Sequence, residues 1–113
     1  MNFCRKDAAA TRDMLPGVRL QTLVYGTKTL MGRFLLRKGA EIPPHEHPYE
    51  QTGILLTGRM TLVSGSDRVE VNGGDSWCIP ENEEHSVTVH EDSEVIEVFS
   101  PVREDYLPSQ PTG

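Results

Sequence analysis

Closely spaced histidines are the first residues in this sequence whose types and positions could support chemistry. His45 and His47 stand two residues apart in the stretch HEHPYEQ. Alternate residues of an extended chain point to the same side, so both imidazoles can converge on one point. His85 opens the run HSVTVH after its own proline-containing turn, whereas His90 ends that run and is expected to be solvated. Three imidazole nitrogens and one side-chain oxygen suit a borderline divalent metal, and Zn, Ni, Mn, Fe and Cu all accept such a set.

Two neighbouring side chains compete for the place of the oxygen ligand. Gln51 shares the parity of the two histidines, whereas Glu50 has the opposite parity and faces away in a regular strand. Pro48 could shift the register, so parity favours Gln51 without excluding Glu50. A neutral amide leaves the charge of a metal ion uncompensated. Such a site is a stronger Lewis acid than one with a carboxylate ligand, and it attracts an anionic substrate better.

The elements that must position these side chains are short β-type runs separated by turn residues. Gly, Pro, Asn and Asp punctuate the chain, and Asn72-Gly73 is a strong hairpin signal. The expected strands are 18–25, 29–37, 51–57, 59–64, 68–71, 76–80, 85–90 and 94–100. Only residues 7–15 could form a helix, which Pro16-Gly17 would end. Eight or nine short strands at regular spacing predict an all-β protein, a small sandwich or barrel.

Length and composition indicate one globular domain. The 113 residues are expected to comprise an N-terminal arm (1–17), a core (about 18–102) and a frayed tail (107–113). A net charge of −6 argues against nucleic acid as a partner. The sequence holds neither an apolar run of the ~20 residues that a membrane span needs nor the apolar segment of a secretory signal, so we expect a cytoplasmic protein with no membrane partner.

The distribution of charge and of cysteines adds two expectations. Residues 1–40 hold eight of the eleven basic residues but only two of the seventeen acids. Basic early strands pairing with acidic later strands would explain this, and a basic arm gripping a neighbouring subunit is the alternative. Trp77 and Cys78 lie in the apolar stretch SWCIP and are expected in the core. A disulfide between Cys78 and Cys4 is not favoured in a reducing compartment.

The spacing of glycines, histidines and one proline resembles that of a known family, the cupins. The first cupin motif matches Gly39, His45, His47, Gln51 and Gly58, with Gln in place of the usual Glu. The second motif matches Gly74, Pro80 and His85. Departures are Asn82, where Gly is usual, and Val89, where Asn is usual. The resemblance covers roughly residues 30–100. It implies a small antiparallel jelly-roll barrel with one metal at its mouth, commonly as a homodimer.

A narrower resemblance lies at the C-terminal end. The stretch EVIEVFSPVREDYL is similar to the ending of small pectin-degradation cupins, which open the ring of 4,5-unsaturated uronates at a Gln-containing metal site. By position, the resemblance implies Glu97 as the acid–base residue, Phe99 as the substrate-binding aromatic residue and Arg103 as a catalytic and substrate-binding arginine. The family more often has Asp where Glu97 stands, and a carboxylate one methylene longer reaches differently.

The residues themselves leave the roles in this ending open. Glu97 interrupts an apolar strand, so it either lies on a solvated face or faces the metal cavity, where desolvation would raise its pKa. Phe99 is a barrel-core residue or a platform for a sugar ring. Arg103 pairs with Glu104 or Asp105 at the surface, or binds an anionic ligand near the metal.

The function that we predict is ring opening and isomerisation of a small anionic sugar, a 4,5-unsaturated uronate, to a keto-uronate. One divalent transition metal held by His45, His47, Gln51 and His85 would be the cofactor. Two other hypotheses stay open, a ligand-sensing or storage cupin without catalysis and an iron-dependent dioxygenase. The neutral Gln51 counts mildly against the dioxygenase.

Overall fold

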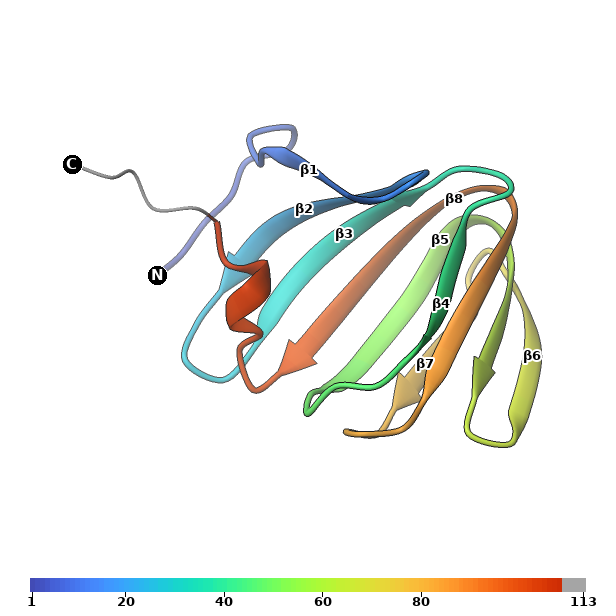
Figure 1. Ribbon diagram of the computed structural model, residues 1–113. Helices are drawn as coiled ribbons and strands as arrows, with labels where there is room; N and C mark the ends of the chain where they lie inside the picture. Colours follow the sequence, from blue (N-terminus) through green and yellow to red (C-terminus); the bar gives the residue numbers. More distant parts are fainter. Residues whose placement is uncertain (109–113) are drawn as a thin grey trace.

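Eight antiparallel strands and one short 3-10 helix make up the part of the chain that the structure describes. This computed structural model describes residues 1–108 of 113. The elements are β1 (Thr11–Leu15), β2 (Val18–Tyr25), β3 (Leu30–Leu36), β4 (Glu41–His45), β5 (Glu50–Ser64), β6 (Asp67–Asn72), β7 (Ser76–Ile79), β8 (His85–Ser100) and the helix η1 (Glu104–Tyr106) (Figure 1). The all-β class expected from the sequence is confirmed. No helix among the described residues is long and apolar enough to cross a membrane.

Strands β5 and β8 are much longer than the runs expected from the sequence. Runs 51–57 and 59–64 form one strand of 15 residues, and runs 85–90 and 94–100 lie in one strand of 16 residues. The pairing of β5 with β8 is irregular around Gly58, which has a φ of +108°, and a Cβ there would lie 2.1 Å from the Ser93 Oγ. Glycine alone tolerates both conditions, so β5 continues through this point as one strand.

The bends let β5 and β8 take part in two facing layers. One layer has the order β1-β2-β3-β8-β5-β7 and uses the second half of β8 and the first half of β5. The other has the order β4-β8-β5-β6 and uses the remaining halves. Figure 1 shows the two long ribbons running side by side between β3 and β6. This arrangement matches the jelly-roll barrel expected from the sequence.

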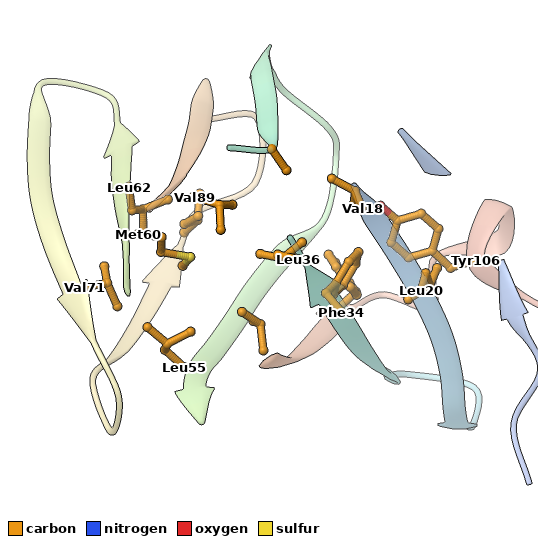
Figure 2. Packing of buried hydrophobic residues seen from close by; sticks show 14 of the residues in the cluster. Val18, Leu20, Phe34, Leu36, Leu55, Met60, Leu62, Val71, Val89 and Tyr106 are labelled. Carbon is orange, nitrogen blue, oxygen red and sulfur yellow. The ribbon is translucent and has the colours of Figure 1, made fainter. Parts of the chain in front are cut away.

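The core fills the space between these layers because alternate residues of each strand point inward. Along β3, Leu30, Gly32, Phe34 and Leu36 are buried, while the residues that alternate with them are half-buried. Figure 2 shows apolar side chains from both layers meeting in this space, with Leu55 and Met60 toward one end. The ring of Tyr106 in η1 packs edge-on against Phe34, with ring centroids 6.0 Å apart (Figure 2).

The N-terminal segment differs from its expected helix. Residues 11–15 form β1, which pairs with β2 through a hairpin in which Gly17 has a φ of +75°. Exposure along β1 alternates with the period of two of a strand rather than that of a helix. The Pro16-Gly17 turn therefore ends a strand, and the basic arm is partly built into the sheet. At the other end, Leu107 packs against the core, and the rest of the predicted frayed tail, beyond residue 108, lies outside the described residues.

The two cysteines are free thiols, and Cys78 is exposed rather than buried. It alternates along β7 with Ile79, which is buried, so parity in a short strand overrides the apolar composition of the stretch. Charges between neighbouring strands fit the expectation that basic early strands pair with acidic later ones. Arg33 of β3 lies 3.0 Å from a carboxylate oxygen of Glu94 on the adjacent β8.

Candidate metal centre

Three histidines meet at one end of the barrel. His45 is the last residue of β4 and pairs in register with His85, the first residue of β8. His47 follows in the loop, where its carbonyl accepts a hydrogen bond from the Asn82 backbone N–H (2.8 Å). One nitrogen of each ring lies within 4.8 Å of a nitrogen of the other two. Asn82 has a φ of +61°, which explains why this turn position suits glycine and why asparagine serves in its place.

Backbone carbonyls fix the tautomers of two of these rings. The Nδ1–H of His45 donates to the Pro43 carbonyl (2.9 Å), and the Nδ1–H of His85 donates to the Glu83 carbonyl (2.8 Å). Each ring therefore offers its Nε2 lone pair, which is the arrangement that orients metal-binding histidines. Burial also lowers the pKa of His85, so its neutral form is favoured.

The remaining polar atoms of the cluster are buried and lack partners. Neither ring nitrogen of His47 nor the Oε1 of Gln51 has a hydrogen-bond partner among the described residues. Burial, with the guanidinium of Arg103 and the neighbouring imidazoles of His85 and His45, lowers the pKa of His47 to about 4. Buried polar atoms without partners are costly and rare in native proteins, so this cluster calls for an additional group.

The donor set fits a divalent metal. Three neutral imidazoles and one amide oxygen are ligands that borderline metals accept. Gln51, the second residue of β5, is buried, while Glu50 is exposed, which is the outcome that parity favours. The three histidine rings lie together, and Gln51 lines the same cavity as His45 and His85. Their role as ligands stays a prediction.

Glu97 lies beside this cluster rather than on a solvated face. The Gln51 amide nitrogen donates to its carboxylate, which leaves the amide oxygen as the one unpartnered Gln51 atom. Glu97 keeps part of its surface accessible because it lines a cavity, but protein surrounds the carboxylate. Burial raises the pKa of Glu97 to about 7, against the opposing effects of Trp77, Gln51 and Arg103.

Arg103 combines the two roles that the sequence left open. Its Nε donates to both carboxylate oxygens of Asp105, at 3.0 and 3.2 Å, as expected for a local pair. It also lines the cavity, and only 13% of its side chain is exposed. The guanidinium lies 3.8 Å from the ring centroid of Tyr106 and 5.4 Å from that of Tyr49. These rings and Asp105 hold a cation at the cavity, and the sequence indicated Asp105 as a partner but neither tyrosine.

Phe99 forms a wall of the same cavity. It is 1% exposed, and its ring packs edge-on against His47 and Tyr106. The cavity has a volume of about 60 Å³, and apolar side chains such as Leu36 and Met60 line it on the barrel side. A groove of about 300 Å³ shares some of its lining residues, including His45 and Arg103. A small ligand can therefore place one polar end among the histidines and extend outward.

His90 and Trp77 lie differently from expectation. His90 is partly exposed but held on the outer face of the sheet by Thr61 and Glu70. Trp77 packs against the core, yet it is only half-buried and lines the cavity beside Glu97. The sequence indicates that Trp77 faces inward, because it lies two residues from the buried Ile79 in the same strand. This alternation does not distinguish a core residue from one that lines a cavity.

Residues 32–100 match the family model of the cupin domain. The chain belongs to the cupin family. This cupin is 26% identical over 103 residues to the pectin degradation protein KdgF of Dickeya dadantii, an alignment that covers 89% of this chain and 94% of that protein. It is 28% identical over 95 residues to the H2HPP isomerase of Bacillus subtilis. That alignment covers 82% of this chain but only 40% of the length of the isomerase.

Solved structures agree with this family assignment. The structure of KdgF from Halomonas sp. matches this cupin with a TM-score of 0.88 and 26% identity, covering 94% of this chain and all of the other. An RmlC-like cupin from Shewanella frigidimarina matches with a TM-score of 0.89 at 23% identity, covering 95% and 96% of the two chains, and supports the fold. The family and the jelly-roll fold expected from the sequence are confirmed. The homodimer stays a prediction, since the structure describes one chain.

Proposed function

We propose that this cupin is a metal-dependent enzyme that opens the ring of a 4,5-unsaturated uronate and isomerises the product to a keto-uronate. The single observation that carries the proposal is that His45, His85, Gln51, Glu97 and Arg103 line one cavity, with His47 completing the histidine cluster beside it. Similarity to KdgF, a pectin degradation protein, along nearly the whole length of both chains supports the choice of substrate.

The metal would be held by the Nε2 atoms of His45 and His85, by one ring nitrogen of His47 and by the Gln51 Oε1. When bound, a divalent ion supplies Lewis-acid stabilisation of negative charge on oxygen. Because all four donors are neutral, the ion keeps its full charge toward the cavity. The Nε2–H donor of Gln51 is already used by Glu97, so the amide presents its oxygen and not its nitrogen to the histidines.

Arg103 is the group that binds the substrate carboxylate. Its Nε is engaged by Asp105, which fixes the plane of the guanidinium and leaves the two terminal nitrogens to form a paired contact with a carboxylate. Asp105 balances the charge of Arg103, so an anionic substrate would balance the charge of a bound metal ion, and the net charge of −6 otherwise repels anions from the protein surface. Phe99 supplies an apolar wall against which the sugar ring packs.

Glu97 moves the proton. Ring opening breaks the bond between C1 and the ring oxygen and removes the proton of the C1 hydroxyl, which leaves an aldehyde and an enolate. Adding a proton at C4 of the enolate gives the keto-uronate, so the reaction is an isomerisation that needs no oxidant. One carboxyl group can accept the first proton and return it, and a pKa of about 7 lets Glu97 populate both forms near neutrality.

The test is a ring-opening assay with 4,5-unsaturated galacturonate, followed by loss of its ultraviolet absorbance. Metal-loaded wild-type protein should turn the substrate over, and Glu97→Gln should lower kcat by about 10²–10⁴-fold with metal still bound. Activity of the wild type no greater than that of a Gln51→Ala/His85→Ala double variant would refute the proposal. If the protein binds 4,5-unsaturated galacturonate tightly without turning it over, and Glu97→Gln leaves this affinity unchanged, a ligand-sensing cupin would be indicated instead. Oxygen consumption that depends on Fe(II) would indicate a dioxygenase.

A further inference from the structure

Glu97 sits in a row of residues that crosses four strands. Register pairs Glu97 of β8 with Gly53 of β5 on one side and with Gly32 of β3 on the other. Gly53 in turn pairs with Trp77 of β7. All four positions face the interior of the barrel. The carboxylate therefore has a glycine on each side, and the next side chain along the row is a tryptophan two strands away.

The indole of Trp77 occupies the space above Gly53. A Cβ built on Gly53 would lie 2.5 Å from the indole Cε2, 2.6 Å from Cζ2 and 2.7 Å from Nε1. Neighbouring strands stand about 4.8 Å apart, so a ring anchored on β7 reaches β8 only by lying across the intervening strand. Gly53 makes this crossing possible, and the indole N–H comes within hydrogen-bonding reach of Glu97.

The opposite side of Glu97 is enclosed in a similar way. A Cβ on Gly32 would lie 3.0 Å from the Leu20 Cδ1, so the Leu20 side chain covers that glycine as the indole covers the other. Leu20 is fully buried and offers only methyl groups. The Glu97 carboxylate thus has an apolar neighbour on one side and hydrogen-bond donors from Trp77 and Gln51 on the other.

We infer that Trp77 is a positioning residue, which lies across Gly53 and holds the Glu97 carboxylate toward Gln51 and the cavity. The inference rests on the proposed function, because the orientation of the carboxylate matters for a proton transfer. A long glutamate between two glycines has room to rotate, and a fixed donor removes that freedom. The indole N–H does this, whereas a phenyl ring at the same position is smaller and offers no donor.

A double-mutant cycle separates positioning from structural support. Trp77→Phe should lower kcat by about tenfold or more, because a hydrogen bond to a charged group is lost, with KM and bound metal little changed. In the Glu97→Gln background the same substitution should cause no further loss, since the group that it positions is already gone. An equal loss in both backgrounds, or wild-type kcat for Trp77→Phe, would overturn the inference.

A second measurement does not depend on activity. Trp77 is the only tryptophan of the chain, so its fluorescence reports on its own surroundings. In metal-free protein, Glu97→Gln should change the emission intensity or maximum, while the matched control Glu94→Gln should not, because Glu94 faces outward and pairs with Arg33. An unchanged spectrum for Glu97→Gln would refute the contact. A changed spectrum in a protein without ring-opening activity would refute the proposed function alone.

Discussion

Two polar clusters share strand β8, and they differ in how their polar atoms find hydrogen-bond partners. His85 and His90 stand five residues apart and face opposite sides of the sheet, inward and outward. The inner cluster, formed by His85 with His45 and His47, contains buried nitrogens without partners among the described residues. In the outer cluster the Thr61 hydroxyl lies 2.8 Å from a Glu70 carboxylate oxygen and 2.6 Å from the His90 Nε2.

The difference shows how a site can be told from a structural network of the same residue types. The outer cluster satisfies its polar atoms internally, and its partly exposed His90 and Glu70 can also turn to water. At His47, the inner cluster offers the ring nitrogens neither a hydrogen-bond partner among the described residues nor contact with water. Unsatisfied polar atoms in a buried place are a cost that folding alone does not justify, so they indicate a ligand.

The sharpest way to test this comparison is to remove one histidine from each cluster. His85→Ala should weaken Zn(II) binding by more than about 100-fold, because even the outer partners of metal ligands contribute 10–100-fold. His90→Ala should leave the affinity unchanged, since its ring faces the other side of the sheet. Equilibrium dialysis with metal analysis measures both. Equal affinities for the two variants would contradict the assignment of the inner cluster.

Changing the charge of the inner cluster should have the next largest effect. In Gln51→Glu the donor to Glu97 is lost and a second carboxylate abuts it, which raises the pKa of Glu97 further. The added charge also weakens the metal as a Lewis acid. We expect metal to remain bound and kcat for uronate ring opening to fall by about tenfold or more. Glu50→Gln, at the exposed neighbouring position, is the matched control. Full activity of metal-loaded Gln51→Glu would show that amide neutrality is unimportant.

The inner cluster could be predicted from the sequence because its information is local. Spacing of two places His45 and His47 on one side, and parity selects Gln51 over Glu50. The all-β fold class could also be predicted, because the alternation within each strand and the turn residues between strands are local features of the sequence. Strand β1 was not predicted from the sequence, because its run TRDML lacks a clear apolar alternation. Pairing with β2 stabilises this strand, which its own residues would not do alone.

Contacts between distant strands could not be predicted in this way. That Trp77 reaches Glu97 depends on the register of β7, β5 and β8 at once, and on a glycine standing between them. The sequence shows each of these residues, but not that they lie side by side on neighbouring strands. Arg103 posed a different difficulty, because its local pair with Asp105 and its place at the cavity are compatible, and the sequence presented them as alternatives.

The buried carboxylate beside the inner cluster should also leave a signature in stability. The pKa of Glu97 is about 7 in the folded protein, above the 4.5 of a free glutamate. The folded state therefore holds a proton that the unfolded state has already released. The stabilising contribution is present below about pH 4.5 and is lost as the pH rises through about 7.

Substituting Glu97 by Gln removes this pH dependence. In metal-free protein, the Tm of Glu97→Gln minus that of the wild type should increase as the pH rises from about 4.5 to about 7, and stay constant above. Effects of the histidines are common to both proteins and cancel in the difference. Thermal melts in chelator at several pH values measure this. A difference that is flat with pH would mean that Glu97 is not desolvated.

The smallest effect is expected in the outer cluster, where Thr61→Val removes the hydroxyl that joins Glu70 and His90. Thr61 is only 3% exposed, but 55% of the Glu70 side chain and 31% of the His90 side chain are exposed, so both regain water as a partner. The free energy of unfolding should therefore fall by only about 1 kcal/mol, with metal binding and activity unchanged. Urea denaturation measures the free energy of unfolding, metal analysis measures metal binding, and the uronate assay measures activity. Loss of metal from Thr61→Val would show that the two clusters are coupled through β8, because no polar contact within the described residues joins them.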